Sequence, residues 1–377
     1  MRRALALALL AMLLTMGSVQ ALSIVTWNTE FLMDARQFEA WRSACDAAGW
    51  DDAASTRQRH EPLPPCDALS GLSPRGERVS KPLHTWADYQ DKLAALRARA
   101  AELDADVLLL QEAGGAVAVA QLLPAGRYRV YTTEGAARTA LHLAVALKTE
   151  VQLITPPTPY LPLAVTVSTR YGPRQLRPGL QFAIDVRGVR VDVLAVHLKS
   201  GCRNDAIDTP RGGARRSDDC AQLRQQVPAV QAWVDARRRS GTPFIVAGDF
   251  NRNLWRERVE QRPARCDASD AAAPLQGACV ANPLPEWDDD PAQRLLLART
   301  QLRAYADGAL CTTKPSRGHG EPLCHCGIDN VLVSASLLSA LRLPLDRLVA
   351  SGAHYGLAHY GPTRARPSDH CPLRVDL

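Results

Sequence analysis

Several features that would identify common classes of protein are missing from this chain of 377 residues. Aromatic residues make up only 5% of it, so a large aromatic surface for contact with lipid has little support. There is no Walker-type glycine loop and no dinucleotide-binding fingerprint, which argues against an enzyme driven by a nucleotide cofactor. Internal repeats and heptad arrays are also absent, so neither a repeat protein nor a coiled coil is indicated.

Long apolar runs are scarce as well. Beyond the N-terminus, no stretch reaches the ~20 apolar residues that a membrane-spanning helix needs. The N-terminus has Arg2 and Arg3, an apolar run over 4–16, and small or modest residues at 19–21, which is typical of a cleaved secretory signal. We therefore predict a signal peptide at residues 1–21 and a secreted or periplasmic protein without a stable membrane span. An uncleaved anchor is the alternative.

Neither sign of charge is in large excess. The chain has 45 Lys and Arg against 39 Asp and Glu, a net charge of +6. A balance this mild permits a polyanionic partner without requiring one. The arginines at 237–239 end a predicted helix, where cations are favoured, and are interpreted as solvated surface.

All 10 cysteines follow the predicted signal peptide, and their even number in an exported chain predicts disulfides. Pairs that are close in sequence within turn-rich segments are expected to bond first. They are Cys45–Cys66, Cys202–Cys220 and Cys266–Cys279. The group at 324–326, Cys-His-Cys, fits no usual zinc-ligand spacing, and bridging is favoured there.

Short aliphatic or β-branched runs predict buried strands at 22–27, 107–110, 143–147, 191–196, 244–247 and 330–333. Amphipathic patterns between them predict helices over 86–103 and 220–239. This alternation suggests sheets enclosed by helices, with functional groups at strand ends. Residues 45–81 and 255–293 are rich in Pro, Asp, Ala and Arg without a steady period, and are predicted to be surface insertions held by disulfides.

Five polar clusters interrupt the apolar runs, each where a strand ends. They are Trp27-Asn28-Thr29-Glu30, Leu110-Gln111-Glu112, Val196-His197-Leu198-Lys199-Ser200, Gly248-Asp249-Phe250-Asn251 and Pro367-Ser368-Asp369-His370. Strand ends of a layered fold can converge on one pocket. Each cluster alone is better explained as a turn, a surface carboxylate or a buried histidine, so it is their order that indicates a site.

In this order the clusters resemble those of the endonuclease/exonuclease/phosphatase superfamily, and Ile328-Asp329-Asn330-Val331-Leu332-Val333-Ser334 resembles a sixth family motif. The resemblance runs from Ile24 to Pro372, and the stretch after His197 is similar to that of a bacterial exported subgroup. It implies a four-layered, DNase I-like α/β sandwich, in which two packed, mainly antiparallel β-sheets are flanked by helices. Residues 22–377 are then expected to form a single domain.

A divalent metal ion is the expected cofactor. Hydrolysis of a phosphodiester needs a hard cation to neutralise the non-bridging oxygens and the leaving group, and carboxylates hold Mg²⁺. The resemblance supports Glu112, Glu30 and Asp369 as its ligands, although Glu30 stands where many relatives have Asp. Mn²⁺ and Ca²⁺ are alternative ions. Asn28 would place an amide near the ion or a phosphate oxygen.

The attacking water must be oriented and deprotonated, and a carboxylate next to an amide donor can do both. The resemblance implies Asp249 as the water activator and Asn251 as its positioner or as a donor to the phosphoryl oxygen. His197 and His370 can donate to developing negative charge, and Asp329 is expected to orient His370. Whether Asp249 or His370 takes the proton of the water is left open.

For the substrate phosphate, Arg177 resembles the family's arginine ahead of the strand that leads to His197, with Arg170 and Arg174 as competitors. DNase-like relatives also have a tyrosine and a second glutamate before this arginine, and here His142 is found in that region instead. The resemblance further brings residues 326 and 371 together through Asp329 and His370. The implied additional disulfides are Cys326–Cys371 and Cys311–Cys324.

The first prediction for function is a nuclease that hydrolyses DNA or RNA phosphodiesters by in-line attack of an activated water. A loop clamped by Cys202–Cys220 supports it, because phosphate contacts from its arginines would add salt-sensitive affinity without sequence preference. These arginines are Arg203, Arg211, Arg215 and Arg216. The alternatives are a phosphatase or phosphodiesterase on a lipid headgroup or phosphorylated small molecule, and a non-catalytic surface binding protein. Oligomeric state is left open by the sequence.

Overall fold

The computed structural model describes residues 21–50, 63–66, 70–72, 78–136, 139–169, 172–203, 207, 213–252, 254, 295–297, 328–343, 353–354, 368 and 370–377. Residues 1–20 of the predicted signal peptide and the predicted insertion at 255–293 lie outside these ranges. In the described part of the chain, no helix has both the length and the apolar character needed to cross a membrane.

The first sheet has the strand order β15-β16-β1-β4-β6-β5. Its strands are β1 (Ser23–Leu32), β4 (Val107–Ala113), β5 (Tyr128–Thr132), β6 (His142–Lys148), β15 (Ala353–His354) and β16 (Leu373–Asp376). The central pair β1–β4 is parallel, and the other neighbours are antiparallel. The parallel pair directs the ends of both strands, and therefore the polar residues that follow them, to the same edge of the sheet.

The second sheet has the order β13-β14-β12-β11-β10-β7. Its strands are β7 (Leu153–Tyr160), β10 (Gly179–Val186), β11 (Val189–His197), β12 (Phe244–Asp249), β13 (Leu295–Leu297) and β14 (Asp329–Ser334). Here β11–β12 is the parallel pair and the other neighbours are antiparallel. Both sheets are therefore mainly antiparallel, with one parallel pair in the middle of each.

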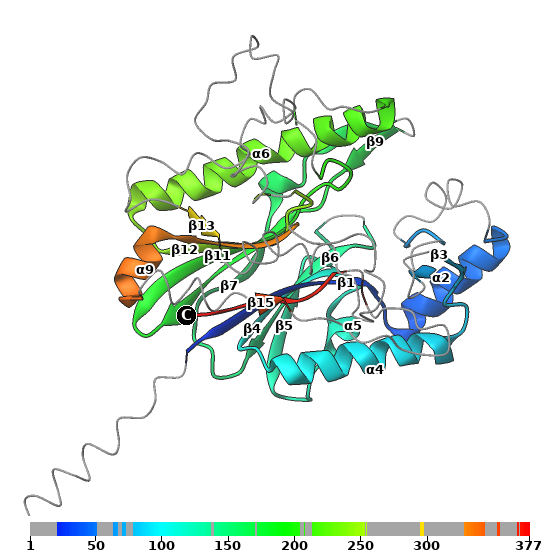
Figure 1. Ribbon diagram of the computed structural model, residues 1–377, viewed down its shortest axis with the longest axis horizontal. Helices are drawn as coiled ribbons and strands as arrows, with labels where there is room; N and C mark the ends of the chain where they lie inside the picture. The colour runs from blue at the N-terminus through cyan, green and yellow to red at the C-terminus, as the bar shows by residue number, and fades with distance from the viewer. Residues whose placement is uncertain are drawn as a thin grey trace, which may run out of the picture.

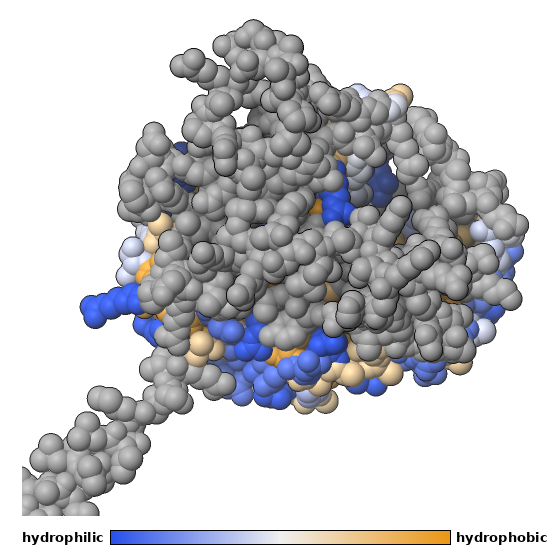
Figure 2. Space-filling view, in the orientation of Figure 1, coloured by the Kyte–Doolittle hydropathy of each residue, from blue (hydrophilic) through white to orange (hydrophobic). Residues whose placement is uncertain are grey.

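Helices cover the outer faces of the two sheets (Figure 1). Helices α2 (Ala35–Ala47), α4 (Trp86–Leu103) and α5 (Ala116–Ala120) pack on the first sheet, and α6 (Ala214–Ser240) packs on the second. Helix α9 (Ala335–Leu341) follows β14 directly and joins the core between the sheets. The predicted four-layered α/β sandwich is thus confirmed. Along the lower edge of the face in Figure 2, where α4 lies in Figure 1, hydrophilic residues are prominent, as expected of an outer layer.

Three clusters of buried apolar side chains separate the layers. The central cluster lies between the sheets, and its members include Ile24, Leu109, Val145, Phe182, Val193, Ile245 and Val333. A second cluster lies beneath α2, α4 and α5, and its members include Trp27, Phe38, Trp41, Tyr89, Leu93 and Leu96. A third lies beneath α6, with Val196, Leu223, Trp233, Val246 and Phe250. Because both faces of the central strands are covered, strands such as β4 and β12 are buried along almost their whole length rather than at alternate positions.

Local signals explain where the helices begin and end. Asp34 and Gln37 form a capping box at the start of α2, which satisfies two backbone N–H groups of the first turn. The Thr85 side chain caps α4 by accepting from the backbone of Asp88. The long helix α6 starts at residue 214, six positions before the predicted start, and ends at Gly241, which takes the left-handed conformation with φ 67°.

The structure describes parts of the first predicted insertion and a further small hairpin. Residues 45–81 contain the end of α2 and a small hairpin of β2 (Ser70–Leu72) and β3 (Arg78–Pro82). A second hairpin, β8 (Thr166–Thr169) and β9 (Gly172–Gln175), follows the short 3-10 helix Leu161–Leu163. Two of the predicted disulfides fall in described segments, and the structure contains both, Cys45–Cys66 and Cys202–Cys220.

The remaining predicted disulfides involve residues that are not described. Cys371 is disulfide-bonded, but Cys326, its predicted partner, lies outside the described residues. The predicted pairs Cys266–Cys279 and Cys311–Cys324 fall outside them entirely. These three pairings stay predictions.

Candidate active site

A pocket of about 380 Å³ opens where the polar ends of the two sheets meet. Its lining residues are Phe31, Glu112, Leu141, Arg177, His197, Ser200, Gly201, Arg203, Asp249, Asn251, Ile328 and His370. Six of the predicted site residues are among them: Glu112, Arg177, His197, Asp249, Asn251 and His370. The pocket is of the size that small-molecule and substrate sites commonly have, and its lining is rich in groups that carry charge or exchange protons.

Strand pairing in the second sheet places three of the predicted site residues side by side. His197 ends β11 and is paired with Asp249 at the end of β12. Asp249 is in turn paired with Asp329, the first residue of β14. Side chains at paired positions lie on the same face of a sheet, so regular pairing alone aligns the imidazole and both carboxylates.

Asp249 is almost fully buried, at 1% exposure, and its carboxylate has several hydrogen-bond donors. Oδ1 accepts from the backbone N–H of Asn251 at 2.7 Å, and Oδ2 accepts from Nδ2 of Asn251 at 3.1 Å and Nδ2 of Asn28 at 3.2 Å. Burial raises the pKa of Asp249 to about 7, although the nearby His370 lowers it. The carboxyl group is therefore poised to exchange a proton near neutral pH.

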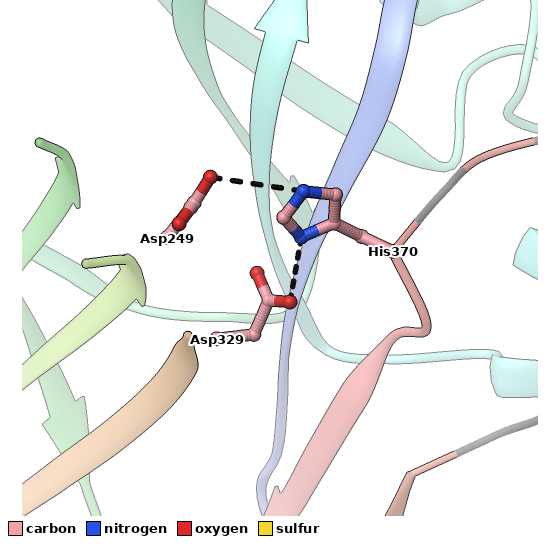
Figure 3. Close-up of side chains that lie close together, drawn as sticks. All are labelled: Asp249, Asp329 and His370. Atoms are coloured by element: carbon pink, nitrogen blue, oxygen red, sulfur yellow. Dashed lines mark hydrogen bonds and ion pairs between the residues drawn. The ribbon is translucent and has the colours of Figure 1, made fainter. Parts of the chain in front are cut away.

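His370 links the two carboxylates of the second sheet, as the close-up in Figure 3 shows. Its Nδ1 is 2.7 Å from Oδ2 of Asp329, and its Nε2 is 3.9 Å from Oδ2 of Asp249. The hydrogen bond to Asp329 fixes the ring so that Nε2 faces Asp249 and the pocket. The structure thus brings Asp329 and His370 together as predicted, in the arrangement of a histidine oriented by a carboxylate.

Asp249, Asp329 and His370 also offer atoms within 4.8 Å of one another, which is the spacing of a metal site. However, Nδ1 of His370 and Oδ2 of Asp329 already form a hydrogen bond of 2.7 Å. A metal ion bound by both atoms would have to replace that bond. The cluster therefore fits proton transfer better than metal binding.

His197 lies near the carboxylates of Asp249 and Glu112. Its Nε2 lies 3.5 Å from Oδ2 of Asp249 and 3.8 Å from Oε1 of Glu112. The ring is almost fully buried and lines the pocket. His197 can therefore donate from Nε2 toward an oxyanion bound between these groups.

The first sheet contributes Asn28 and Glu112 from neighbouring parallel strands. Asn28 Nδ2 donates to Oε1 of Glu112 at 3.2 Å as well as to Asp249, so one amide joins the two sheets. Glu112 adopts a left-handed backbone conformation, with φ 58°, next to the irregularity in β4. This conformation is unusual for a residue with a side chain and turns the Glu112 carboxylate into the pocket.

Glu30, a predicted metal ligand, lies beside a buried lysine of α4. It lies in a bulge of β1, where Glu30 and Phe31 both have positive φ values, 49° and 56°. Its carboxylate Oε2 is 3.6 Å from Nζ of Lys92, and the same ammonium donates to the Glu30 backbone carbonyl at 2.5 Å. Lys92, from α4, is only 1% exposed. Glu30 is not among the described residues that line the pocket.

Arg177 lines the pocket but directs two of its donors to the backbone. Its Nε donates to the carbonyl of His197 at 3.0 Å and its Nη2 to the carbonyl of Leu198 at 2.6 Å. Burial lowers the pKa of Arg177 to about 10, against the influence of Glu112 and Asp249. The guanidinium therefore remains a cation at neutral pH. Of its two predicted competitors, Arg174 is exposed and Arg170 lies outside the described residues.

Asn251 follows Asp249 in the left-handed conformation, with φ 52°. Its Nδ2 also donates to the Leu198 carbonyl at 2.9 Å, so the side chain ties the end of β12 to the chain after β11. His142 is buried at the start of β6 beside the pocket residue Leu141, and burial lowers the pKa of its imidazole. Asp369, a predicted metal ligand, lies outside the described residues.

Two supporting residues were not assigned a role from the sequence. The Ser368 hydroxyl donates to the Asn28 carbonyl at 2.7 Å and accepts from the His370 backbone N–H at 3.0 Å, which ties the final motif to β1. Lys92 was overlooked although it stands in the apolar stripe of α4, between Tyr89 and Leu96. A lone lysine on the buried face of a helix was the signal available in the sequence.

The donor set of the pocket fits a hard divalent cation. Glu112 offers carboxylate oxygens at the pocket wall. Carboxylate oxygens are the ligands that Mg²⁺ and Ca²⁺ prefer, and none of the described pocket residues is a cysteine that would favour a softer ion.

Comparison with known proteins agrees with this geometry. The sequence model of the Endonuclease/Exonuclease/phosphatase family matches residues 25–370. Among solved structures, a humanized D. rerio TDP2 shows 14% identity and a TM-score of 0.48, covering 95% of this chain and 99% of that one. Sphingomyelinase C from Streptomyces griseocarneus shows 15% identity and a TM-score of 0.43, covering 94% and 98%.

The human Nocturnin catalytic domain shows 12% identity and a TM-score of 0.41, covering 94% of this chain and 93% of that one. No curated protein sequence matches the chain. The family match, in contrast, spans most of the chain and includes the polar clusters that meet in the pocket. The chain therefore belongs to the Endonuclease/Exonuclease/phosphatase family, whose members are phosphoric ester hydrolases that generally depend on a divalent metal ion.

Proposed function

We propose that the protein is an exported, divalent-metal-dependent nuclease that hydrolyses DNA or RNA phosphodiester bonds by in-line attack of an activated water. The observation that carries the proposal is the convergence of Glu112, His197, Asp249 and His370 on one pocket. They come from strands of both sheets and combine a metal-binding carboxylate, a carboxyl group that titrates near neutrality and two imidazoles.

In this proposal Glu112 holds the metal ion, which is Mg²⁺ or, alternatively, Mn²⁺ or Ca²⁺. When bound, the ion supplies positive charge that neutralises the phosphoryl oxygens and the leaving group. Glu30 and Asp369 are proposed as further ligands. For Glu30 this requires its carboxylate to leave Lys92, which lies 3.6 Å away.

Asp249 is proposed to orient the water and take its proton. A general base is most effective when its pKa lies near the working pH, and burial raises the pKa of Asp249 to about 7. Asn251 holds this carboxylate through both its backbone and side-chain N–H groups. Asn28 donates to both Asp249 and Glu112, so it would hold the base and the metal-binding carboxylate in a fixed position relative to each other.

The histidines are proposed to stabilise the negative charge that develops on the phosphoryl oxygens. His197 offers Nε2 from one side of Asp249, and His370 offers Nε2 from the other. Asp329 holds the His370 ring through Nδ1 and stabilises its protonated form. His370 is also the alternative proton acceptor, since its Nε2 faces the same space as Asp249. Arg177 is proposed to bind the scissile phosphate with donors other than Nε and Nη2.

Export is the remaining part of the proposal. It is supported by the N-terminal pattern of Arg2 and Arg3 followed by an apolar run, and by the disulfides Cys45–Cys66 and Cys202–Cys220. N-terminal sequencing of the protein recovered from its producing cells is expected to begin at Leu22. A recovered chain that still begins at residue 1 would contradict cleavage.

The substrate class is tested by incubating the purified protein with supercoiled plasmid, RNA, sphingomyelin and inositol phosphates. Each substrate is tested with Mg²⁺ and with a chelator, beside a His370→Ala protein of the same thermal stability. We expect metal-dependent cleavage of plasmid or RNA that is lost in the variant. Release of a lipid headgroup or inorganic phosphate while both nucleic acids stay intact would support the alternative phosphodiesterase or phosphatase. Absence of any hydrolysis would favour a binding protein.

A further inference from the structure

One wall of the pocket is formed by the chain that follows β11. Ser200, Gly201 and Arg203 all line the pocket, only a few residues after His197. Loops at a binding site are usually its most mobile part. This one is instead held at several points, which suggests that the position of its side chains matters for the site.

Helix α6 holds the first half of this wall. The Lys199 backbone N–H donates to Oε1 of Gln226 at 2.8 Å, and Nζ of Lys199 donates to Oδ1 of Asp219 at 2.5 Å. Between them, Gly201 has φ 101°, and a Cβ atom there would lie 2.2 Å from Oδ2 of Asp219. The close approach of the backbone to α6 therefore requires a glycine at this position.

A covalent bond and a buried arginine hold the second half. Cys202 is bonded to Cys220 of α6, with a Cα–Cα distance of 4.9 Å. Arg252, which follows the catalytic end of β12 and is 1% exposed, donates from Nη1 to the Cys202 carbonyl at 2.6 Å. Arg203 follows Cys202 directly. The disulfide of Cys202 and the hydrogen bond to its carbonyl therefore hold the backbone beside the pocket just before Arg203.

The lining of the pocket contains charged side chains of both signs. Glu112 and Asp249 give the catalytic side two carboxylates, whereas Arg177 and Arg203 are the cations among the described lining residues. Arg177 uses Nε and Nη2 to hold the carbonyls of His197 and Leu198, close to the reacting groups. Arg203 supplies positive charge from farther along the chain after β11, in the part that α6 and Arg252 hold in place.

We propose, on the basis of the nuclease function proposed above, that Arg203 binds the phosphate next to the one being cleaved. A nucleic acid presents a monoanionic phosphate at every residue, so a second cation that lines the pocket beside the reacting groups can meet a second anion. A diester with a single phosphate has no group for this site. Arg203 thus makes the protein selective for polyphosphodiester chains over isolated diesters.

The test compares two substrates that share the same reacting bond. One is a short single-stranded oligonucleotide, and the other is a dinucleoside monophosphate, which lacks neighbouring phosphates. Deoxyribose and ribose forms of both are used. The wild-type protein is compared with Arg203→Gln, with Arg203→Lys, and with Arg224→Gln, which removes an exposed arginine from the same helix that holds the wall.

In Arg203→Gln, we expect the ratio of kcat/KM for the oligonucleotide to kcat/KM for the dinucleoside monophosphate to fall about tenfold, as for loss of one charged hydrogen bond. The slope of log kcat/KM against log salt concentration on the oligonucleotide should decrease by about 0.7, because one phosphate contact is lost. Arg203→Lys should retain the slope, and Arg224→Gln should retain both quantities. Thermal unfolding of each variant checks that the fold is intact.

An equal loss on both substrates with an unchanged salt slope would overturn the inference, because it would show a structural role for Arg203. Wild-type values in Arg203→Gln would also overturn it while leaving the nuclease function intact. If the wild-type protein hydrolyses neither substrate but does hydrolyse another phosphoester, the proposed function is wrong and the second phosphate site fails with it.

Discussion

The two sheets bring their functional groups to the pocket in opposite ways. In the second sheet, His197, Asp249 and Asp329 are consecutive partners in regular strand pairing. In the first sheet, the corresponding residues stand where pairing breaks down, and Glu30, Phe31 and Glu112 all have positive φ values. A regular ladder places side chains without further support, whereas a bulge must be stabilised by contacts from elsewhere.

Helix α4 supplies that support for the first sheet. Lys92 donates to the Glu30 carbonyl, and the Tyr89 hydroxyl donates to the Phe31 carbonyl at 3.0 Å while accepting from the Met33 backbone N–H at 2.6 Å. The proposed metal-binding side of the pocket therefore depends on a helix on the outer layer. The proposed proton-transfer side depends mainly on its own strands. Substitutions in the two regions should accordingly have different consequences.

The largest effect is expected from Asp249→Asn in the second sheet. Removal of the proposed base should lower kcat by about a thousandfold, while the amide keeps the shape of the side chain. Steady-state kinetics on the substrate identified by the panel of phosphoesters measure this, with circular dichroism to check the fold. Activity within tenfold of the wild type would assign the proton transfer to His370 instead.

In the first sheet, Lys92→Met should act mainly on stability. The substitution removes the buried cation beside the Glu30 carboxylate and the donor to the Glu30 backbone carbonyl. The free energy of unfolding should therefore fall by about 3 kcal/mol. Chemical denaturation gives the free energy of unfolding, with Asp91→Asn, an exposed site on the same helix, as the control. Glu30→Gln added to Lys92→Met should recover part of the loss. A loss below about 0.5 kcal/mol would show that α4 does not support the bulge.

A third prediction concerns pH. The folded protein raises the pKa of Asp249 to about 7, above the ~3.9 of an unfolded chain, so the folded state binds this proton more tightly. The contribution of Asp249 to the free energy of unfolding is fully present below pH ~4 and is lost as the pH rises toward about 7. In chelator, Asp249→Asn should therefore gain stability relative to wild type by about 1 kcal/mol per pH unit across this window. Curves of Tm against pH that run parallel for the two proteins would contradict the raised pKa of Asp249.

The same contrast explains what could be predicted from the sequence. The apolar runs ending in His197 and Asp249 predicted strands β11 and β12 and their shared edge, because regular strands leave a simple pattern. The pairing of Glu30 with Lys92 could not be predicted, because it depends on a bulge that a linear pattern does not reveal. The edge strand β7, Leu153–Tyr160, was missed because its prolines cannot donate to a neighbour and weaken the strand signal.

The central claim is that the first sheet holds the metal ion and the second sheet transfers the proton. It is tested most directly by measuring the rate of hydrolysis as a function of Mg²⁺ concentration in wild type, Glu112→Gln and Asp249→Asn. If Glu112 holds the metal, its variant should need a higher Mg²⁺ concentration for half-maximal rate and should recover activity as Mg²⁺ rises. Asp249→Asn should keep the wild-type Mg²⁺ requirement and a low maximal rate at every concentration. The reverse pattern, with Mg²⁺ rescuing Asp249→Asn and leaving Glu112→Gln unchanged, would contradict the account.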